Sequence, residues 1–413
     1  MTYTAGSEVT VAQDRTPSSG VRIPGLDGLR GLAALFVVLH HCYLVSFPGY
    51  PRTTGPWWAG WMIYGHLAVV VFIVLSGFSL AVGPARRGWR IGSLRTYSHR
   101  RAWRILSAYW PALAFSLLMA WFVLPQPPGG SATLRSVVVY GLLVQDVTDA
   151  PSPNGAFWSI AVEAQLYLLL PIMFLIARKR GVAAMVFAVA LPVLLIGLLS
   201  PSSDFVQLFV RFTPQLAVGF VAGAAAMGLA VHERWARLPF PALAATCAAL
   251  PLAMIVVGGS QWTVAHYFWV DLAVTPSVAF LLAGCATGGA PRIARPLETP
   301  ALRSLGGFSY SLYLVHAPIV VAIGELVVLP AVGHGPDAMA LMLVLAVPVS
   351  LVVSRGFAAL FDLPFQRHKS WSALGAAGRA RLRTARQWTR LGAPRASSHA
   401  PAGHRGSITN PWE

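Results

Sequence analysis

The chain contains little charge and almost no lysine, and these scarcities narrow what it can be. Charged residues are 11% of the 413 residues, hydrophobic residues are 56%, and the mean hydropathy is +0.62. Soluble globular domains carry about 25% charged residues. The sequence therefore predicts a polytopic membrane protein rather than a soluble one.

Cysteines and acidic residues are also scarce. The cysteines, Cys42, Cys247 and Cys285, lie in apolar stretches without paired spacing, so we predict no disulfide and no metal site. Cys42 follows His41 but points elsewhere on a helix, which disfavours it as a nucleophile. The sequence has only 14 acidic residues and 31 Lys and Arg residues, which gives a formal net charge of +17. The basic residues form short runs between apolar segments, which indicates cytoplasmic loops and no nucleic-acid partner.

The apolar segments predict an all-α bundle of about ten transmembrane helices with both termini in the cytoplasm. A cytoplasmic tail is expected over residues 1–21, with no cleavable signal peptide, and a basic cytoplasmic tail over 366–413. Counting 134–145 as a crossing would put Arg178, Lys179 and Arg180 outside, so we expect that segment to be re-entrant or interfacial. The expected spans within the transmembrane domain, 22–365, are 25–46, 58–82, 103–124, 157–177, 182–200, 205–231, 239–258, 266–289, 302–329 and 337–361.

The first span, GLDGLRGLAALFVVLHHCYLVS, combines apolar residues with Arg30, His40 and His41. An ionisable group in the hydrocarbon region costs on the order of 2.5 to 3.5 kcal/mol, so such groups normally face protein or a wet cavity. Arg30 and His41 are eleven residues apart, which places them on one helix face about 16 Å apart along the axis. His40 points elsewhere. The alternative is an arginine that anchors the span and a histidine that packs.

Three further spans carry polar groups. Glu163 is expected at the depth of His41, where a carboxylate would orient the imidazole, although an ion pair with Arg211 is an alternative. Tyr167 shares its face. The span from 302 to 329 contributes interhelical hydrogen-bonding groups or catalytic ones: Ser309, Tyr310, Tyr313 and His316. A basic cluster, suited to phosphates or simply to setting topology, contains Arg100, Arg101 and Arg104.

Five segments in order resemble the acyltransferase 3 family of integral membrane acyltransferases. They are LDGLRGLAALFVVLHH, FIVLSGFSL, RRAWRILSAYWP, FWSIAVEAQLYLLLP and GFSYSLYLVHAP, between residues 26 and 318. The resemblance implies an acyl-CoA donor, usually acetyl-CoA, a hydroxyl acceptor, often on a carbohydrate, and a ten-span core. Departures are Ser107 in place of a proline and Ala164 in place of a polar residue. A soluble esterase domain of the SGNH type is not expected, which disfavours a two-step relay.

The family pattern of an arginine followed after ten residues by a histidine selects Arg30 and His41. Other motif residues of the family correspond to the following positions: Arg101, Arg104, Glu163, Tyr310 and His316. We expect acyl-CoA to dock from the cytoplasm with its phosphates on Arg30 and the basic cluster. His41, oriented by Glu163, would act as a general base or take the acyl group covalently, and Tyr310 or His316 would stabilise the oxyanion.

The acceptor class stays open at this point. A hydroxyl of an exported glycan fits a site in the outer third of the plasma membrane, and a macrolide or another secondary metabolite is the alternative. An arginine-rich, lysine-poor composition suggests a GC-rich bacterial genome, which is compatible with the second. A proton-coupled transporter would also use buried His, Glu and Arg, but no paired halves are visible. A membrane scaffold that recruits partners through its basic tail is a third possibility.

Overall fold

The fold was taken from a computed structural model, which describes residues 22–124, 131–368, 370–376 and 379. The chain divides into two compact units, residues 1–363 and 364–413. All site residues considered below lie in the first unit. The predicted amino-terminal tail, 1–21, and most of the predicted basic tail, 366–413, lie outside the described residues.

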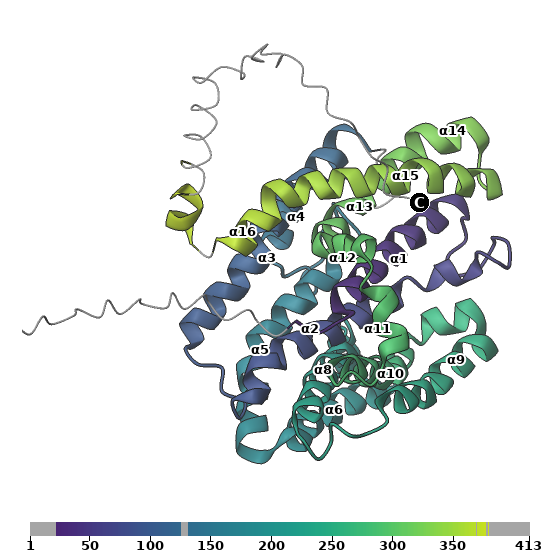
Figure 1. The fold of residues 1–413 in the computed structure, drawn as a ribbon. Coiled ribbons are helices and arrows are strands. Elements are labelled where there is room, and N and C mark those ends of the chain that lie inside the picture. Colours follow the sequence, from purple (N-terminus) through teal and green to yellow (C-terminus); the bar gives the residue numbers. More distant parts are fainter. Residues whose placement is uncertain (1–21, 125–130, 369, 377–378, 380–413) are drawn as a thin grey trace, which may run out of the picture. The chain divides into compact units, whose positions relative to one another are not determined.

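Every regular element in the described ranges is helical (Figure 1), as the sequence predicts. The first helices are α1 Leu26–Ser46, η1 Gly60–Tyr64, α2 His66–Arg86, α3 Leu94–Phe122, α4 Leu134–Gly141, α5 Trp158–Arg180, α6 Val182–Leu199, η2 Ser200–Ser202, α7 Asp204–Val210 and α8 Gln215–Val231. They are followed by α9 Phe240–Ala265, α10 Tyr267–Ala286, α11 Pro291–Leu297, α12 Pro300–Gly307, α13 Ser309–Ile323, η3 Gly324–Val328, α14 Leu329–Val332, α15 Pro336–Phe357, η4 Ala358–Asp362 and α16 Leu363–Arg367.

Nine helical segments of the described chain are long and apolar enough to cross a membrane, and the bent pair α7 and α8 makes a tenth. The protein is therefore a multi-pass membrane protein with an all-helical bundle. The sequence predicts one continuous helix over 205–231, but α7 and α8 meet at 49°. Thr213 has φ 45° and Pro214 opens α8 without an N–H donor, which accounts for the break.

Some helices begin or break at other residues than the predicted spans do. α3 begins at Leu94, nine residues before the expected start, because Ser93 caps it through the Thr96 amide. The arginines expected in a loop, 95 to 104, therefore lie along a helix. The predicted span 302–329 is divided between α12 and α13 at Phe308. α4 has 8 residues and is too short to cross, as expected for a re-entrant or interfacial segment.

Small residues let the central helices approach closely. A Cβ at Gly77 of α2 would overlap the Phe220 carbonyl of α8, and a Cβ at Gly223 would overlap the Val74 carbonyl. At the start of α1, Gly28 makes the same kind of contact with the Leu297 carbonyl of α11, and Gly306 of α12 makes it with the Asp27 carbonyl of α1. Close backbone approach through small residues is a common way to pack helices in membranes. These contacts fix α1 and α2, which carry part of the candidate site.

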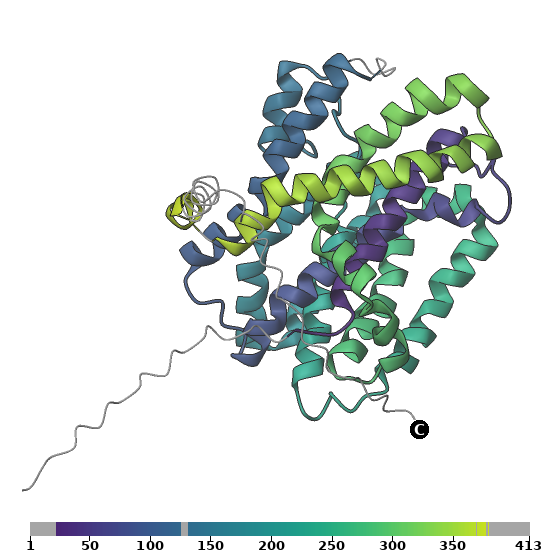
Figure 2. The same ribbon diagram turned by 45° about the horizontal axis from the view of Figure 1, so that its top comes forward.

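The helices around α1 and α2 form the polar centre, while others present apolar side chains outward. Figure 1 shows α1 with α13 and α15 on one side and α2 on the other, and in Figure 2 the yellow-green α15 passes across the purple α1. All three neighbours contact α1. On α6 and α9, Phe187, Val256 and Val257 are more than two-thirds exposed. Such apolar exposure is expected where helices face lipid.

Candidate active site

A cavity of about 320 Å³ lies beside the first turns of α1, between α2, α3, α5 and α13. We call it the arginine cavity. Its polar lining includes Arg30, Ser76, Arg101, Arg104, Glu163 and Tyr310. A smaller cavity of about 260 Å³ shares Leu80 and Arg101 with it and is also lined by Arg87 and Arg100. The structure thus brings Arg30, Arg101 and Arg104 together, and it places Arg100 in the adjoining space.

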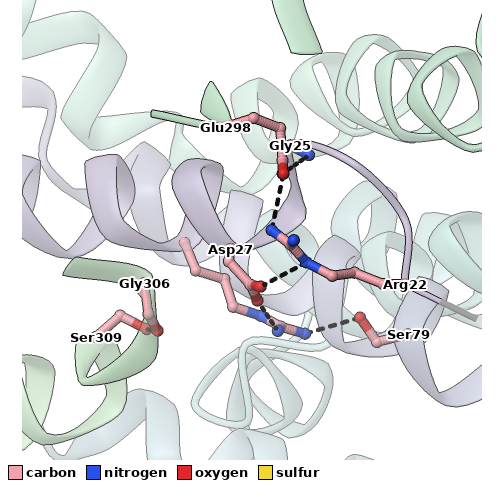
Figure 3. Close-up of polar contacts among 8 residues, drawn as sticks. Arg22, Gly25, Asp27, Ser79, Glu298, Gly306 and Ser309 are labelled. Atoms are coloured by element: carbon pink, nitrogen blue, oxygen red, sulfur yellow. Dashed lines mark hydrogen bonds and ion pairs between the residues drawn. The ribbon is translucent and has the colours of Figure 1, made fainter. Parts of the chain in front are cut away.

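Arg30 is held by side chains on both sides of its guanidinium (Figure 3). One Nη atom donates to Ser79 Oγ at 2.8 Å, and the other lies 3.5 Å from Asp27 Oδ1. Arg22 approaches Asp27 at 3.7 Å and donates to Glu298 at 2.8 Å. The second oxygen of Glu298 accepts from the Gly25 amide at 2.7 Å. This network fixes the start of α1 and leaves the Arg30 side chain 33% exposed toward the cavity.

Arg101 and Arg104 enter the cavity from the long amino-terminal half of α3. Arg101 lies over the Tyr167 ring at 5.9 Å, and its Nε is buried without a hydrogen-bond partner among the residues that the structure describes. Arg104 donates to Asp362 Oδ1 at 3.2 Å and lies over the Tyr310 ring at 5.7 Å. Asp362 is only 1% exposed. Arg104 is therefore partly neutralised, whereas the Arg101 guanidinium has a buried donor to offer an anion.

Glu163 does not orient His41 in this structure. Its Oε1 accepts hydrogen bonds from Ser76 Oγ, at 2.8 Å, and from the Tyr167 hydroxyl. No hydrogen bond between the described residues joins Glu163 to His41, and Arg211 pairs with Asp149 at 2.6 Å instead of with Glu163. Both predicted partnerships of Glu163 were wrong. Equal depth along two helices does not make their side chains face each other, and Glu163 faces the arginine cavity.

The His41 imidazole is oriented by a backbone carbonyl and by His316. Its Nδ1 lies 2.9 Å from the Val37 carbonyl oxygen and 3.3 Å from His316 Nε2. His316 Nδ1 lies 3.1 and 2.9 Å from the carbonyls of Leu312 and Tyr313. Carbonyl oxygens only accept, so each Nδ1 must carry the proton. His316 Nε2 then accepts from His41 Nδ1, and His41 Nε2 keeps its lone pair.

The remaining predicted residues separate by location. His40 Nδ1 bonds the Met62 carbonyl at 2.9 Å, so the two adjacent histidines do have different environments. The Tyr310 hydroxyl donates to the Ile105 carbonyl of α3 at 3.2 Å, at the arginine end of the cavity. Tyr310 is therefore not beside His41 and His316. In the residues the structure describes, no group of three His, Cys, Asp or Glu side chains is arranged for a metal.

The arginine cavity does not reach the two histidines. Phe72 and Tyr313, whose rings lie 5.6 Å apart, are among its lining residues, whereas neither His41 nor His316 lines it. The Tyr313 ring lies 5.9 Å from the His316 ring, and its hydroxyl donates to the Ala156 carbonyl at 3.0 Å. The Tyr313 ring thus lines the cavity and also lies beside His316. The predicted open path from Arg30 to His41 is not seen as a single cavity, because Arg30 lines this cavity and His41 does not.

Two serines of the site were missed from the sequence. Ser76 and Ser79 bind Glu163 and Arg30 respectively, and both lie in the segment FIVLSGFSL. Their spacing of three residues puts them on one helix face, and this periodic pair of hydroxyls within an apolar run was a usable signal. Asp362, which binds Arg104, offered no comparable signal. It is a single acidic residue several positions after the end of α15 and belongs to no periodic pattern.

Comparison with known proteins fits this arrangement. The family model for the acyltransferase domain of acyltransferase 3 proteins matches residues 23–355. The chain belongs to the acyltransferase 3 family. This membrane acyltransferase is 26% identical to the acyltransferase MdmB of Streptomyces mycarofaciens over 335 residues, which are 74% of this chain and 80% of MdmB. No solved structure matches it.

Two further relatives of the acyltransferase are longer. The O-acetyltransferase OatA of Staphylococcus aureus is 25% identical over 331 residues, 73% of this chain and 51% of OatA. The putative peptidoglycan O-acetyltransferase YrhL of Bacillus subtilis is 26% identical over 328 residues, 72% of this chain and 49% of YrhL. The chain thus matches about half the length of these two proteins.

Proposed function

We propose that this acyltransferase transfers an acyl group, acetyl in the simplest case, from acyl-CoA to a hydroxyl of a carbohydrate or an exported glycoconjugate. The observation that carries the proposal is the convergence of Arg30, Arg101 and Arg104 on one cavity. Guanidinium groups bind phosphates bidentately, and CoA presents several phosphates. The buried, unpartnered Nε of Arg101 favours an anionic occupant.

The relatives and the charge distribution support the rest of the assignment. OatA is named an O-acetyltransferase and YrhL a putative peptidoglycan O-acetyltransferase, which favours an acetyl donor and a glycan hydroxyl. The positive-inside rule would place the basic start of α3, and with it the arginine cavity, on the cytoplasmic side of the plasma membrane. Both termini would then be cytoplasmic, and acyl-CoA would enter from the compartment that contains it.

The chemistry would take place at His41. Its Nε2 lone pair would accept the proton of the acceptor hydroxyl while the oxygen attacks the thioester carbonyl carbon. The carbon–sulfur bond then breaks, and the CoA thiolate takes the proton back from the imidazolium. His316 would act as a positioning residue, since its own N–H is bound to backbone carbonyls. Glu163 would order Ser76 and Tyr167 along the path of the pantetheine arm.

The distance along α1 suits this assignment. The eleven residues from Arg30 to His41 correspond to about 16 Å of helix, which is commensurate with the pantetheine arm. The arm would have to pass the Phe72 and Tyr313 rings to reach His41, because these rings line the cavity and His41 does not.

The decisive experiment is acyl-CoA consumption by the purified protein in lipid. Acetyl-CoA labelled in the acetyl group is supplied with a panel of acceptors: muropeptides, oligosaccharides, methyl glycosides and macrolides. We expect CoA release that depends on an acceptor, with label on a sugar hydroxyl. If label appeared on a macrolide alone, the acceptor class would be a macrolide instead of a carbohydrate. Uptake of a solute into vesicles without CoA release would overturn the enzyme in favour of a transporter.

A further inference from the structure

A second histidine site lies at the His41 end of the bundle, where α2, α8 and α10 meet. His66 Nε2 lies 2.9 and 3.0 Å from the two carboxylate oxygens of Asp271. Asp271 is 1% exposed, and Gln215 Nε2 also donates to it, at 3.2 Å. Nothing in the proposed chemistry at His41 uses these three residues. A carboxylate that holds one imidazole nitrogen is the arrangement that fixes a histidine tautomer.

The contacts of His66 leave one nitrogen available. Its ring is stacked between Tyr267, with centroids 4.1 Å apart, and Trp158, 5.5 Å apart. Both ring faces are therefore covered, and only the ring edge is accessible. The side chain is 16% exposed, and Nδ1 has no partner among the described residues and is not one of the fully buried polar atoms. With the Nε2 proton donated to Asp271, Nδ1 presents a lone pair.

A second acceptor atom lies in the same cluster. Gln215 donates through Nε2 to Asp271, but its Oε1 is buried and has no hydrogen-bond partner in the described chain. A buried polar atom without a partner is unfavourable, and it is satisfied by a ligand that donates. His66 Nδ1 and Gln215 Oε1 are thus both hydrogen-bond acceptors without a donor, and hydroxyl groups of a ligand would be suitable donors.

The cluster adjoins both parts of the candidate active site. Gly65, next to His66, packs so closely on His40 that a Cβ there would overlap the His40 ring. The His40 ring lies 5.1 Å from that of His41. On the other side, Trp158 precedes Ser159, which lines the arginine cavity and bonds the Tyr313 hydroxyl at 2.7 Å. His66 therefore adjoins the His40 ring through its neighbour Gly65 and the lining of the arginine cavity through Trp158.

We propose that His66, held by Asp271, binds the acceptor through a hydroxyl that donates to Nδ1, with Trp158 and Tyr267 forming an aromatic edge beside it. The ligand class is a polyhydroxylated molecule such as a glycoside, because the site offers two acceptor atoms and aromatic surface but no free charge. This inference rests on the proposed function and names its acceptor subsite. The structural alternative is that the pair only joins α2 to α10.

The test separates binding from structure with His66→Gln. The Gln Nε2 group can still donate to Asp271, so the helix contact is kept while the Nδ1 acceptor is lost. With the best glycoside of the panel as acceptor, we expect its KM to rise about tenfold, the effect of one hydrogen bond. The KM for acetyl-CoA and the melting temperature should stay unchanged. His266→Gln is the matched control, since His266 is also stacked on an aromatic ring, Trp262, but bonds only a backbone carbonyl.

Asp271→Asn provides the second variant. The asparagine amide can donate to Nε2, which moves the imidazole proton to Nδ1 and turns the acceptor into a donor. It should raise the acceptor KM at least as much as His66→Gln. An unchanged acceptor KM in His66→Gln, or a loss confined to melting temperature in both variants, would leave only the structural role. If the unmodified protein consumes no acetyl-CoA with any acceptor, the proposed function fails first and this inference with it.

Discussion

The Arg30 end and the His41 end of α1 differ in space, charge and the source of their order. At the first, three arginines line a cavity of about 320 Å³, and hydroxyl or carboxylate groups hold two of them. At the second, two imidazoles lie 4.8 Å apart, outside that cavity, and backbone carbonyls fix their protons. Charge is concentrated where we propose that a phosphate binds, and an imidazole with a free Nε2 lies where we propose that the chemistry occurs.

The contrast explains how one helix would serve both proposed tasks. A guanidinium that binds an anion must keep open donors, so its protein partners satisfy only some of them. A general base must keep one lone pair and one orientation, and carbonyl acceptors supply this without adding charge. The two ends should therefore respond differently to mutation: changes at the arginine end should alter the KM for acyl-CoA, and changes at the histidine end should alter kcat.

The largest effect is expected for His41→Ala. Loss of the general base should lower kcat by about 10² to 10⁴-fold, with the KM for acetyl-CoA nearly unchanged. His40→Ala is the matched control, because His40 is the adjacent histidine and bonds only the Met62 carbonyl, and it should keep at least a tenth of the activity. Steady-state rates of acceptor-dependent CoA release measure both. Normal turnover by His41→Ala would show that His41 is not the general base.

Arg30→Gln tests the other end. Charge-assisted hydrogen bonds contribute about 1.5–3 kcal/mol, so the KM for acetyl-CoA should rise about 10- to 100-fold with a smaller change in kcat. Arg22→Gln is the control, because it belongs to the same network (Figure 3) but does not line the arginine cavity. Equal KM increases in the two variants would mean that Arg30 only supports the network, contrary to our assignment.

Sequence patterns predicted the arginine end better than the histidine end. Arg30, Arg101 and Arg104 were grouped because charge in an apolar chain stands out, and the structure brings them to one cavity. The helical period placed Arg30 and His41 on one face, but it carries no information about which neighbouring helix each residue meets. Glu163 was therefore paired with the wrong groups. Of its actual partners, Tyr167 was expected on the same face from its spacing of four residues, whereas Ser76 lies on another helix and is a hydroxyl that hydropathy barely registers.

Helix boundaries show the same limit. Hydropathy found the membrane-crossing segments because burying charge in lipid is costly. It put the start of α3 nine residues too late, since arginines favour a helix as readily as a loop, and it missed the breaks at Thr213 and Phe308. The His66–Asp271 contact joins residues 205 positions apart, and no local pattern predicts which distant helix supplies the carboxylate.

A smaller effect is expected for His316→Phe, which removes the acceptor of the His41 Nδ1–H bond. The Val37 carbonyl still holds that proton, so kcat should fall only about tenfold, the value of one hydrogen bond, while the KM for acetyl-CoA stays constant. His316→Gln can restore an acceptor and should recover part of the loss. Recovery separates a positioning role from simple packing, since a packing role predicts that the larger phenylalanine is the milder change.

The smallest effect concerns Asp146, in the loop between α4 and α5 and away from both ends of α1. Burial raises the pKa of its carboxyl to about 6, against a hydrogen bond from Gln165 at 3.1 Å and the charge of Arg211. The folded protein thus binds this proton more tightly than the unfolded chain, whose value is 3.8. Stability should fall as pH rises from about 4 to about 6 and then level off. Asp146→Asn should abolish this slope, seen as a shift of a few degrees or less in melting temperature across that range. The pH profile of kcat should be unchanged in Asp146→Asn. If the pH dependence of stability were instead lost in His41→Ala, the titrating group would lie at the histidine end.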